Sequence, residues 1–210
     1  MRKMFATLLA LALAALGSSA TSAAEDPPTR PPTVLVTGAN RGIGLEFTRQ
    51  YVESGWKVIA TARDPTNATE LQQLAFQHAN LVVEKLDLAD NAAIATLAQK
   101  YRGQPIDVLL NNAGYLGEPD KQSLGKTFDY PMFEQIMRVN AYAPLVMSQA
   151  FLDNVLAGDQ KKIIALTSGI GSVTLAARFG GLVFYRMSKA SLDLGMRALQ
   201  ADVRSRGIKV

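Results

Sequence analysis

Two side chains with the chemistry for proton transfer lie close together in the sequence: the phenol of Tyr185 and the ammonium group of Lys189. A spacing of four residues places both on one face of a helix. A neighbouring cation stabilises phenolate and lowers the pKa of a tyrosine toward the range that suits general acid–base catalysis. The pair predicts that Tyr185 exchanges a proton with a substrate, although an exposed helical pair without a function would show the same spacing.

A glycine-rich segment in the first third of the chain is suited to binding phosphate. It reads TGANRGIG over residues 37–44, with glycines at Gly38, Gly42 and Gly44, and it stands between a β-branched run and a helical pattern. Such glycines let the backbone turn tightly and approach a pyrophosphate, and free amide groups at a helix start bind the anion. A glycine-rich turn by itself can be a simple loop that binds nothing, but its place between strand and helix indicates a dinucleotide site.

The charges after the second predicted strand favour NADP(H) over NAD(H). An NAD enzyme places Asp or Glu there, about 20 residues after the glycine loop, to bind the ribose 2′-hydroxyl. In this chain the stretch 60–63 (ATAR) has no carboxylate. The guanidinium group of Arg63 suits a 2′-phosphate, and Arg41 in the glycine loop can reach the same group. The alternative is that both arginines are solvated and that Asp64 turns inward to serve as the acid.

Short β-branched runs alternate with longer helical patterns from Thr33 onward. The expected strands span residues 33–37, 57–62, 81–85, 106–110 and 161–166, and residues 208–210 look like the opening of a sixth. The expected helices span residues 43–54, 66–77, 91–101, 132–156 and 183–205, with Asp90 capping the third and Pro144 bending the fourth. This alternation predicts an α/β fold, a Rossmann-like doubly wound parallel sheet that is truncated at the start of strand six.

The composition excludes several other classes of protein. Of 210 residues 48% are hydrophobic and 19% are charged, which excludes a disordered chain. There is no cysteine and only one histidine, His78, so neither a disulfide scaffold nor a metal site is expected, and His78 is interpreted as a surface residue at a helix end. A formal net charge of +4 without a basic run excludes a nucleic-acid partner.

The first residues are expected to lie outside the fold. Residues 1–24 have a basic start, an uncharged run and small residues before Glu25, as a secretory signal peptide does. The apolar run is too short to span a bilayer, which needs about 20 residues, so no stable membrane insertion is expected after signal cleavage. Residues 25–32 form a proline-rich tether, and residues 33–210 form the nucleotide-binding domain. A genuine signal makes the protein periplasmic or secreted; otherwise it is cytoplasmic.

Together these motifs resemble those of the short-chain dehydrogenase/reductase family. The glycine loop matches that family's TGxxxGxG, and Tyr185 with Lys189 matches its YxxxK. Residues 111–114 (NNAG) match a motif after the fourth strand, and Ser168 lies in the serine segment after the fifth. The matches occur in family order over residues 33–210. The RDP after the second strand and the YRMSKASL helix are similar to those of small NADPH-dependent carbonyl reductases.

The resemblance implies a mechanism in which hydride passes between the nicotinamide and a carbonyl carbon while Tyr185 exchanges a proton with the oxygen. Ser168 then hydrogen-bonds that oxygen, Lys189 holds the nicotinamide ribose and Asn140 anchors a water in a proton relay. The implied catalytic residues are Asn140, Ser168, Tyr185 and Lys189. The implied cofactor-binding residues, with Asp87 at the adenine amino group, are Thr37, Gly38, Asn40, Arg41, Gly42, Ile43, Gly44, Arg63, Asp87, Leu88, Asn112, Ala113, Gly114, Tyr185 and Lys189.

Two of these roles have alternatives. The Ser168 hydroxyl can cap a turn instead, with Thr167 or Ser172 as rival hydroxyl groups. Asn140 can satisfy helix backbone near Pro144 instead of anchoring a water.

The chain differs from the family in stopping at Val210, before the Pro-Gly turn and the helical substrate lid that the family carries. The expectation is therefore a truncated chain, with strand five as a nearly bare hydrophobic edge. The expected function is that of an NADP(H)-dependent oxidoreductase acting on a small-molecule carbonyl or alcohol, a homo-oligomer in its full-length form. The alternatives are a catalytically incomplete dinucleotide-binding or interaction protein, and a sugar-nucleotide epimerase or dehydratase on the same scaffold.

Overall fold

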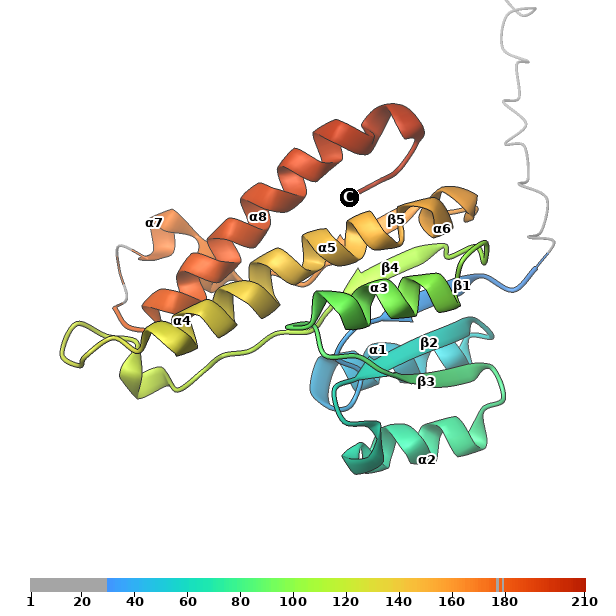
Figure 1. Ribbon diagram of the computed structural model, residues 1–210, viewed down its shortest axis with the longest axis horizontal. Coiled ribbons are helices and arrows are strands. Elements are labelled where there is room, and N and C mark those ends of the chain that lie inside the picture. Colours follow the sequence, from blue (N-terminus) through green and yellow to red (C-terminus); the bar gives the residue numbers. More distant parts are fainter. Residues whose placement is uncertain (1–29, 177, 179) are drawn as a thin grey trace, which may run out of the picture.

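The computed structural model describes residues 30–176, 178 and 180–210, so the expected signal peptide and most of the tether lie outside the described residues. Five parallel strands form one sheet in the order β3-β2-β1-β4-β5. Helices cover both faces of this sheet (Figure 1). The predicted Rossmann-like doubly wound α/β fold is confirmed.

All the predicted strands are present. They are β1 Thr33–Val36, β2 Lys57–Ala62, β3 Leu81–Lys85, β4 Val108–Asn111 and β5 Lys162–Ala165. The α-helices are α1 Gly42–Glu53, α2 Thr69–Gln77, α3 Asn91–Lys100, α4 Tyr130–Met137, α5 Ala143–Ala150, α6 Leu152–Ala157, α7 Val173–Ala176 and α8 Val183–Val203. Asp90 caps α3 as predicted, because its carboxylate accepts hydrogen bonds from the amides of Ala92 and Ala93 at 2.8 and 3.2 Å.

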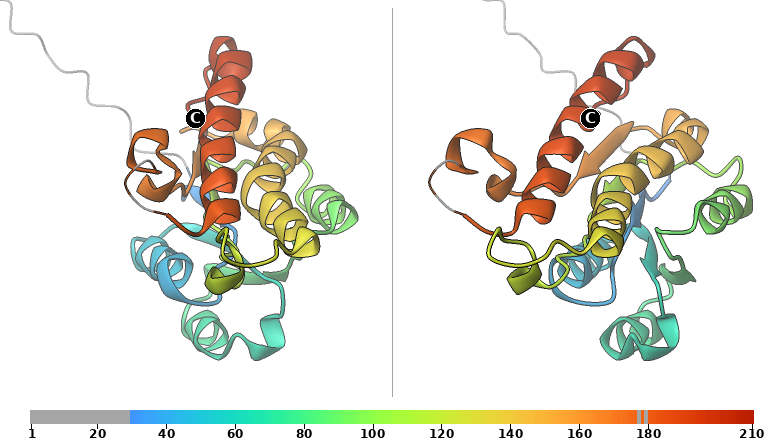
Figure 2. Two further views of the ribbon diagram at one scale, coloured as in Figure 1. Left: turned by 90° about the vertical axis from the view of Figure 1, so that its left-hand side faces the viewer. Right: turned by 60° about the vertical axis from the view of Figure 1, so that its left-hand side comes forward.

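The three inner strands β1, β2 and β4 are buried on both sides, except for Lys57 at the start of β2, as their continuous apolar runs require. Leu35 of β1 lies in one buried cluster with residues of α3, α5, α6 and the C-terminal end of α8. Its neighbours Val34 and Val36 lie in a second cluster with residues of α1 and α2. Figure 2 shows the sheet between these two sets of helices. None of the helices in the described residues is long and apolar enough to cross a membrane.

The long helix predicted over residues 132–156 is present, but it is not one regular α-helix. α4, a π-helical turn at Arg138–Tyr142 and α5 follow one another directly, and a break at Phe151 separates α5 from α6. Proline has no backbone N–H, and its ring clashes with the carbonyl group four residues earlier. The irregular turn therefore comes immediately before Pro144, and it is this turn that carries Asn140.

The residues before Val210 run along β5. The amide of Ile163 donates to the carbonyl of Lys209 at 2.8 Å, and the amide of Lys209 donates to the carbonyl of Lys161 at 2.9 Å. This parallel bridge stands where the sequence predicted the opening of a sixth strand. It covers part of the edge that was expected to be bare, while Ile164 of β5 remains 39% exposed.

A buried carboxylate closes the amino end of the sheet. Asp107, which is 0% exposed, accepts two hydrogen bonds from the guanidinium group of Arg30 at 2.8 and 3.0 Å. It also accepts one from the amide of Thr33 and one from the amide of Asp159, each at 2.7 Å. This residue joins β1, β4 and the segment that leads into β5.

Candidate active site

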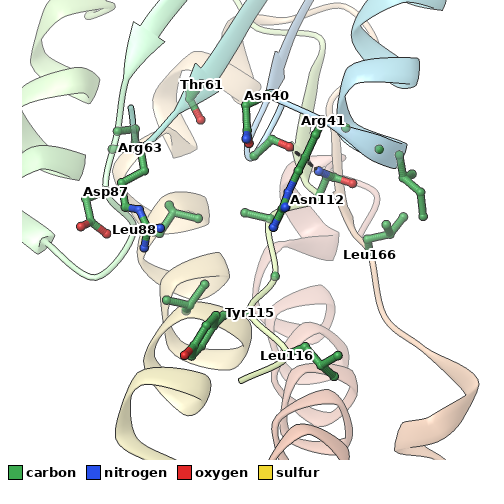
Figure 3. A pocket seen from close by; sticks show the side chains of 18 of the residues that line it. Asn40, Arg41, Thr61, Arg63, Asp87, Leu88, Asn112, Tyr115, Leu116 and Leu166 are labelled. Atoms are coloured by element: carbon green, nitrogen blue, oxygen red, sulfur yellow. Dashed lines mark hydrogen bonds between the residues drawn. The ribbon is translucent and has the colours of Figure 1, made fainter. Parts of the chain in front are cut away.

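A cleft of about 770 Å³ opens at the carboxyl end of the sheet, which is where open parallel sheets bind their ligands. Every sequence-predicted site residue lines it except Thr37 and Asn140. Figure 3 shows Arg63 and Asp87 toward one end of the cleft and Tyr115 and Leu116 toward the other. A molecule bound in the cleft could therefore contact the carboxyl end of β2 and Tyr185 at the same time.

The glycine loop forms the floor of this cleft. Gly38 has φ +67°, and a Cβ there would lie 2.8 Å from the Cα of Ala113. A Cβ on Gly44 would collide with the carbonyl oxygen of Gly38 and the side-chain amide of Asn112. The first turn of α1 has no acidic side chain, and Arg41 before it makes no side-chain cap. The first amide groups of α1 are thus directed at the cleft without a competing internal anion.

Thr37 lies beneath the cleft instead of in its wall, and it is 1% exposed. Its hydroxyl oxygen accepts hydrogen bonds from the amides of Asn112 and Ala113 at 3.1 and 3.2 Å. The Asn112 side chain donates in return to the carbonyls of Thr37 and Gly38 at 2.9 and 3.1 Å. The two motifs that the sequence placed about 70 residues apart are therefore bound to each other.

Arg41 and Arg63 both direct their guanidinium groups into the cleft (Figure 3). Within residues 30–176, 178 and 180–210, neither side chain takes part in an ion pair. Two cations that face the same cleft are suited to a phosphate group.

The carboxylate of Asp64 is hydrogen-bonded within its own turn. One carboxylate oxygen accepts hydrogen bonds from the hydroxyl and amide of Thr66 at 2.6 and 3.1 Å, and the other accepts from the side chain of Asn67 at 2.6 Å. The hydrogen bonds from Thr66 and Asn67 lower the pKa of Asp64. Asp64 lines the cleft, but both its oxygens already have donors.

Asp87 and Leu88 form the cleft wall after β3. One oxygen of the Asp87 carboxylate accepts a hydrogen bond from the amide of Ala89 at 2.9 Å, which holds the turn in place. Leu88 is 8% exposed and belongs to the core cluster beneath.

Lys189 lies below the ring of Tyr185, with Nζ 5.7 Å from the ring centroid. The Lys189 side chain is 3% exposed, and its ammonium group donates to the carbonyl of Leu166 at 2.8 Å. Burial lowers the pKa of Lys189, and burial raises the pKa of Tyr185. The predicted lowering of the Tyr185 pKa is therefore wrong for the protein without a ligand, because burial of the phenol outweighs a cation that is directed elsewhere.

Asn140 is 0% exposed and ties two walls of the cleft together. Its Oδ1 accepts from the amide of Tyr115 at 2.7 Å, and its Nδ2 donates to the carbonyl of Tyr115 at 2.9 Å and to the hydroxyl of Ser188 at 3.0 Å. Ser188 in turn donates to the carbonyl of Tyr185 at 2.8 Å. Asn140 therefore satisfies backbone of a distant loop, not the helix backbone near Pro144.

Ser168 and Thr167 both line the cleft, whereas Ser172 does not. The Ser168 oxygen accepts a hydrogen bond from the amide of Ile170 at 3.3 Å, which caps a short turn, and its proton is left to donate elsewhere. Ser172 caps α7 through the amide of Leu175 at 3.4 Å.

Sequence reasoning missed several residues of the wall. Thr61, Leu86 and Leu166 stand at or just beyond the carboxyl ends of strands, a position that could have been found from the predicted elements. Gln135 and Val139 come from α4 and the π-turn, and only the packing of those turns brings them in. The additional lining residues are Thr61, Asn67, Leu86, Tyr115, Leu116, Gln135, Val139 and Leu166.

The site uses no imidazole. His78 ends α2, and it is not among the residues that line the cleft. In the part of the chain that the structure describes, no group of three or more His, Asp or Glu side chains is placed to hold a metal ion.

Comparison with known proteins places this arrangement in a family. The family model for short chain dehydrogenases matches residues 32–210. The (+)-neomenthol dehydrogenase of Arabidopsis thaliana is 32% identical over 164 residues, which are 68% of this chain and 55% of that protein. The short-chain dehydrogenase/reductase atnB of Arthrinium is 32% identical over 188 residues, 83% of this chain and 70% of the relative. The chain thus spans about half the length of the plant relative.

Solved structures show the same likeness. An NADPH-bound carbonyl reductase from chicken fatty liver has a TM-score of 0.75 and 34% identity, covering 85% of this chain and 77% of its own. A short-chain dehydrogenase/reductase from Burkholderia multivorans with bound NADP has a TM-score of 0.75 and 30% identity, covering 84% and 75%. The matching family model, the fold and the glycine loop bound to the NNAG segment agree: the chain belongs to the short-chain dehydrogenase family.

Proposed function

We propose that this protein is an oxidoreductase that transfers a hydride between NADP(H) and a small carbonyl or alcohol, with Tyr185 as general acid–base. The observation that carries the proposal is that one cleft holds the glycine loop, two arginines, Tyr185 and Lys189. A bound dinucleotide supplies the hydride, and the residues of the chain bind it, orient the carbonyl and move the proton.

The cleft fits the cofactor in its 2′-phosphorylated form. Gly38 and Gly44 lack the Cβ atoms that would collide with Ala113 and Asn112, so the glycine loop can pack tightly at the cleft, and the start of α1 is free of acidic groups. Arg41 and Arg63 supply positive charge where the 2′-phosphate would lie, and Asp64 is bonded to its own turn. The NADPH-bound carbonyl reductase and the NADP-bound bacterial structure among the similar proteins support this choice.

The raised pKa of Tyr185 suits proton donation. A half-buried phenol whose pKa is raised keeps its proton at neutral pH, so it can donate that proton to a carbonyl oxygen as negative charge develops there. We propose that the Ser168 hydroxyl donates a second hydrogen bond to that oxygen. Carbonyl reduction needs the protonated phenol, so its rate should fall as pH rises through the Tyr185 pKa.

Lys189 and Asn140 meet at Gly114. A Cβ on Gly114 would lie 3.8 Å from Nζ of Lys189 and 3.7 Å from Oδ1 of Asn140. We propose that Lys189 holds the nicotinamide ribose and that Asn140 anchors the water that links Lys189 to solvent. The hydrogen bonds between Asn140 and the backbone of Tyr115 also hold the loop after β4 in place over the cleft.

The substrate end of the cleft favours an uncharged molecule. Tyr115 and Leu116 lie toward this end (Figure 3), and Val139 and the neutral polar Gln135 also line the cleft. A charged substrate would lose hydration there without gaining an opposite charge. We therefore propose a small or medium apolar carbonyl as the substrate class.

The experiment is to measure NADPH and NADH binding and then the turnover of a panel of charged and uncharged carbonyls. We expect tighter binding of NADPH, and turnover of uncharged carbonyls that Tyr185→Phe abolishes. Tyr51→Phe is the matched control, since burial raises the pKa of Tyr51 as well and it lies outside the cleft. NADPH binding without Tyr185-dependent turnover would favour the alternative, a non-catalytic dinucleotide-binding protein.

A further inference from the structure

The loop between β4 and α4 contains a polar side chain that is completely buried and that the proposed reaction does not use. Gln122 is 0% exposed and ends a short 3₁₀ turn at Pro119–Lys121. In Figure 1 this loop runs out beyond the sheet toward the start of α8. Burying an amide costs free energy unless its donors and acceptors are bonded, so its partners indicate what it does.

Gln122 bonds to the first turn of α8. Its Oε1 accepts a hydrogen bond from the amide of Tyr185 at 3.0 Å, and its own carbonyl accepts one from the amide of Val183 at 3.1 Å. Its Nε2 donates to the carbonyl of Leu116 at 2.7 Å and to the carbonyl of Glu118 at 3.4 Å. A single residue thus connects the backbone of Tyr185 to the backbone of Leu116, and both of these residues line the cleft.

The helix cannot make this cap for itself. The residue before its first turn is Leu182, which has no side-chain acceptor and has φ +53°, in the left-handed region. The first amide groups of a helix have no partner within the helix. Two of them, those of Val183 and Tyr185, are satisfied by Gln122 from a loop about 60 residues earlier in the chain.

We propose that Gln122 is a positioning residue: it caps α8 from outside and holds Tyr185 at a set distance from the substrate-side wall at Leu116. This inference rests on the proposed function, since it assumes that Tyr185 acts on a substrate in the cleft. Gly117 supports it, because a Cβ there would lie 3.2 Å from Nε2 of Gln122 and 2.8 Å from Cδ1 of Ile136. Because Gly117 has no Cβ, the backbone of the loop can come close enough to Gln122 and Ile136 for the Gln122 side chain to be buried.

Two variants separate the acceptor and donor roles of the Gln122 side chain. Gln122→Glu keeps an acceptor for the Tyr185 amide and removes the amide donor to the carbonyls of Leu116 and Glu118. Gln122→Met has a similar volume and removes both roles. Both should fold, because Phe184 also packs on Phe128 and Phe133, with ring centroids 5.0 and 5.3 Å away.

Gln200 provides the matched control. Its side chain also joins two segments, donating to the carbonyl of Ile208 at 3.1 Å and accepting from the amide of Val210 at 2.7 Å, and it does not line the active-site cleft. Gln200→Met therefore loses comparable hydrogen bonds without touching the start of α8.

The first measurement is amide hydrogen exchange of Tyr185 by NMR on the full chain, which needs no activity. We expect exchange of the Tyr185 amide to accelerate in Gln122→Met and to stay slow in Gln122→Glu and Gln200→Met. Unchanged exchange in Gln122→Met would overturn the cap. This readout tests the cap even if the wild-type protein turns over no carbonyl, an outcome that would refute the proposed function instead.

The second measurement is carbonyl reduction at saturating NADPH. We expect kcat to fall about 10- to 100-fold in Gln122→Met, since a small misplacement of the reacting groups costs that much. In Gln122→Glu we expect kcat to be largely kept and the KM for the carbonyl to rise, because only the bonds to the carbonyls of Leu116 and Glu118 are lost. Equal loss of kcat in both Gln122 variants, or a comparable loss in Gln200→Met, would show that Gln122 contributes stability alone.

Discussion

Charged side chains at the two ends of the sheet have opposite environments. At the amino end, the fully buried carboxylate of Asp107 accepts hydrogen bonds from Arg30 and from the amides of Thr33 and Asp159. At the carboxyl end, Arg41 and Arg63 are exposed and take part in no ion pair among the described residues. The carboxylate at the amino end therefore has partners within the fold, whereas the two guanidinium groups at the carboxyl end face the cleft.

This difference separates stability from function. A buried charge that keeps all its partners holds the fold together, and its removal leaves those partners unpaired. A cationic group without an internal partner adds little to the fold, but it is available to a ligand anion. Changes at the amino end should therefore alter stability, and changes at the carboxyl end should alter binding and turnover.

Lys189→Met should give the largest effect and the sharpest contrast. Loss of the ammonium group should lower carbonyl turnover by about 10²- to 10⁴-fold, while the midpoint of thermal unfolding stays the same or rises. The reason for the second effect is that burial already lowers the pKa of Lys189, so the fold gains nothing from its charge. Initial rates and a thermal melt test both parts, and a destabilised variant would show that this end also serves the fold.

Asp107→Asn should be the largest loss of stability from a single change at the amino end. We expect the free energy of unfolding to fall by about 3 kcal/mol, because Arg30 and several amides lose an ionised acceptor. NADPH affinity of the folded protein should not change.

Urea unfolding and a fluorescence titration measure these two quantities. The control is Asp159→Asn, whose side chain is 63% exposed and also pairs with Arg30, at 3.1 Å. Its loss should be below about 1 kcal/mol. Equal losses in the two variants would contradict the role given to burial.

Arg63→Ala should affect binding and leave stability unchanged. Removal of a charged hydrogen bond to a phosphate should weaken NADPH binding by about 10- to 100-fold, and NADH binding should be nearly unchanged. Arg102→Ala is the control, since Arg102 is exposed and lies outside the cleft. The prediction fails if both cofactors lose affinity to the same extent.

The smallest effect is the dependence of stability on pH in the acid range. Burial opposes ionisation of Asp107, but hydrogen bonds from Arg30, Thr33 and Asp159 outweigh it and lower the Asp107 pKa. A carboxyl group with a lowered pKa stabilises the fold above its unfolded value, about 3.9 for Asp, and this contribution is lost as pH falls through the folded value. The unfolding free energy of the wild type should therefore decline below about pH 4 more steeply than that of Asp107→Asn. Parallel slopes would refute this assignment.

Much of the fold could be predicted because its signals are local. Apolar runs of β-branched residues mark each strand, and the strand at Lys57–Ala62 is found with the same bounds in the structure. The π-turn within the helical stretch over 132–156 could not be predicted, because it depends on how backbone groups are satisfied in three dimensions. The wall residues Gln135 and Val139 were missed for the same reason.

Residue types and their order supplied the reactive and binding groups: glycines after the first strand, arginines before and after the second, and a tyrosine and lysine four residues apart. Those features follow from residue type and spacing, which the chain carries without folding. Folding was needed to bond Asp64 to its own turn, to raise the pKa of Tyr185 by burial, and to bring Gln122 to the start of α8. Each of these depends on desolvation or on a hydrogen bond whose partners and orientation exist only in the folded chain.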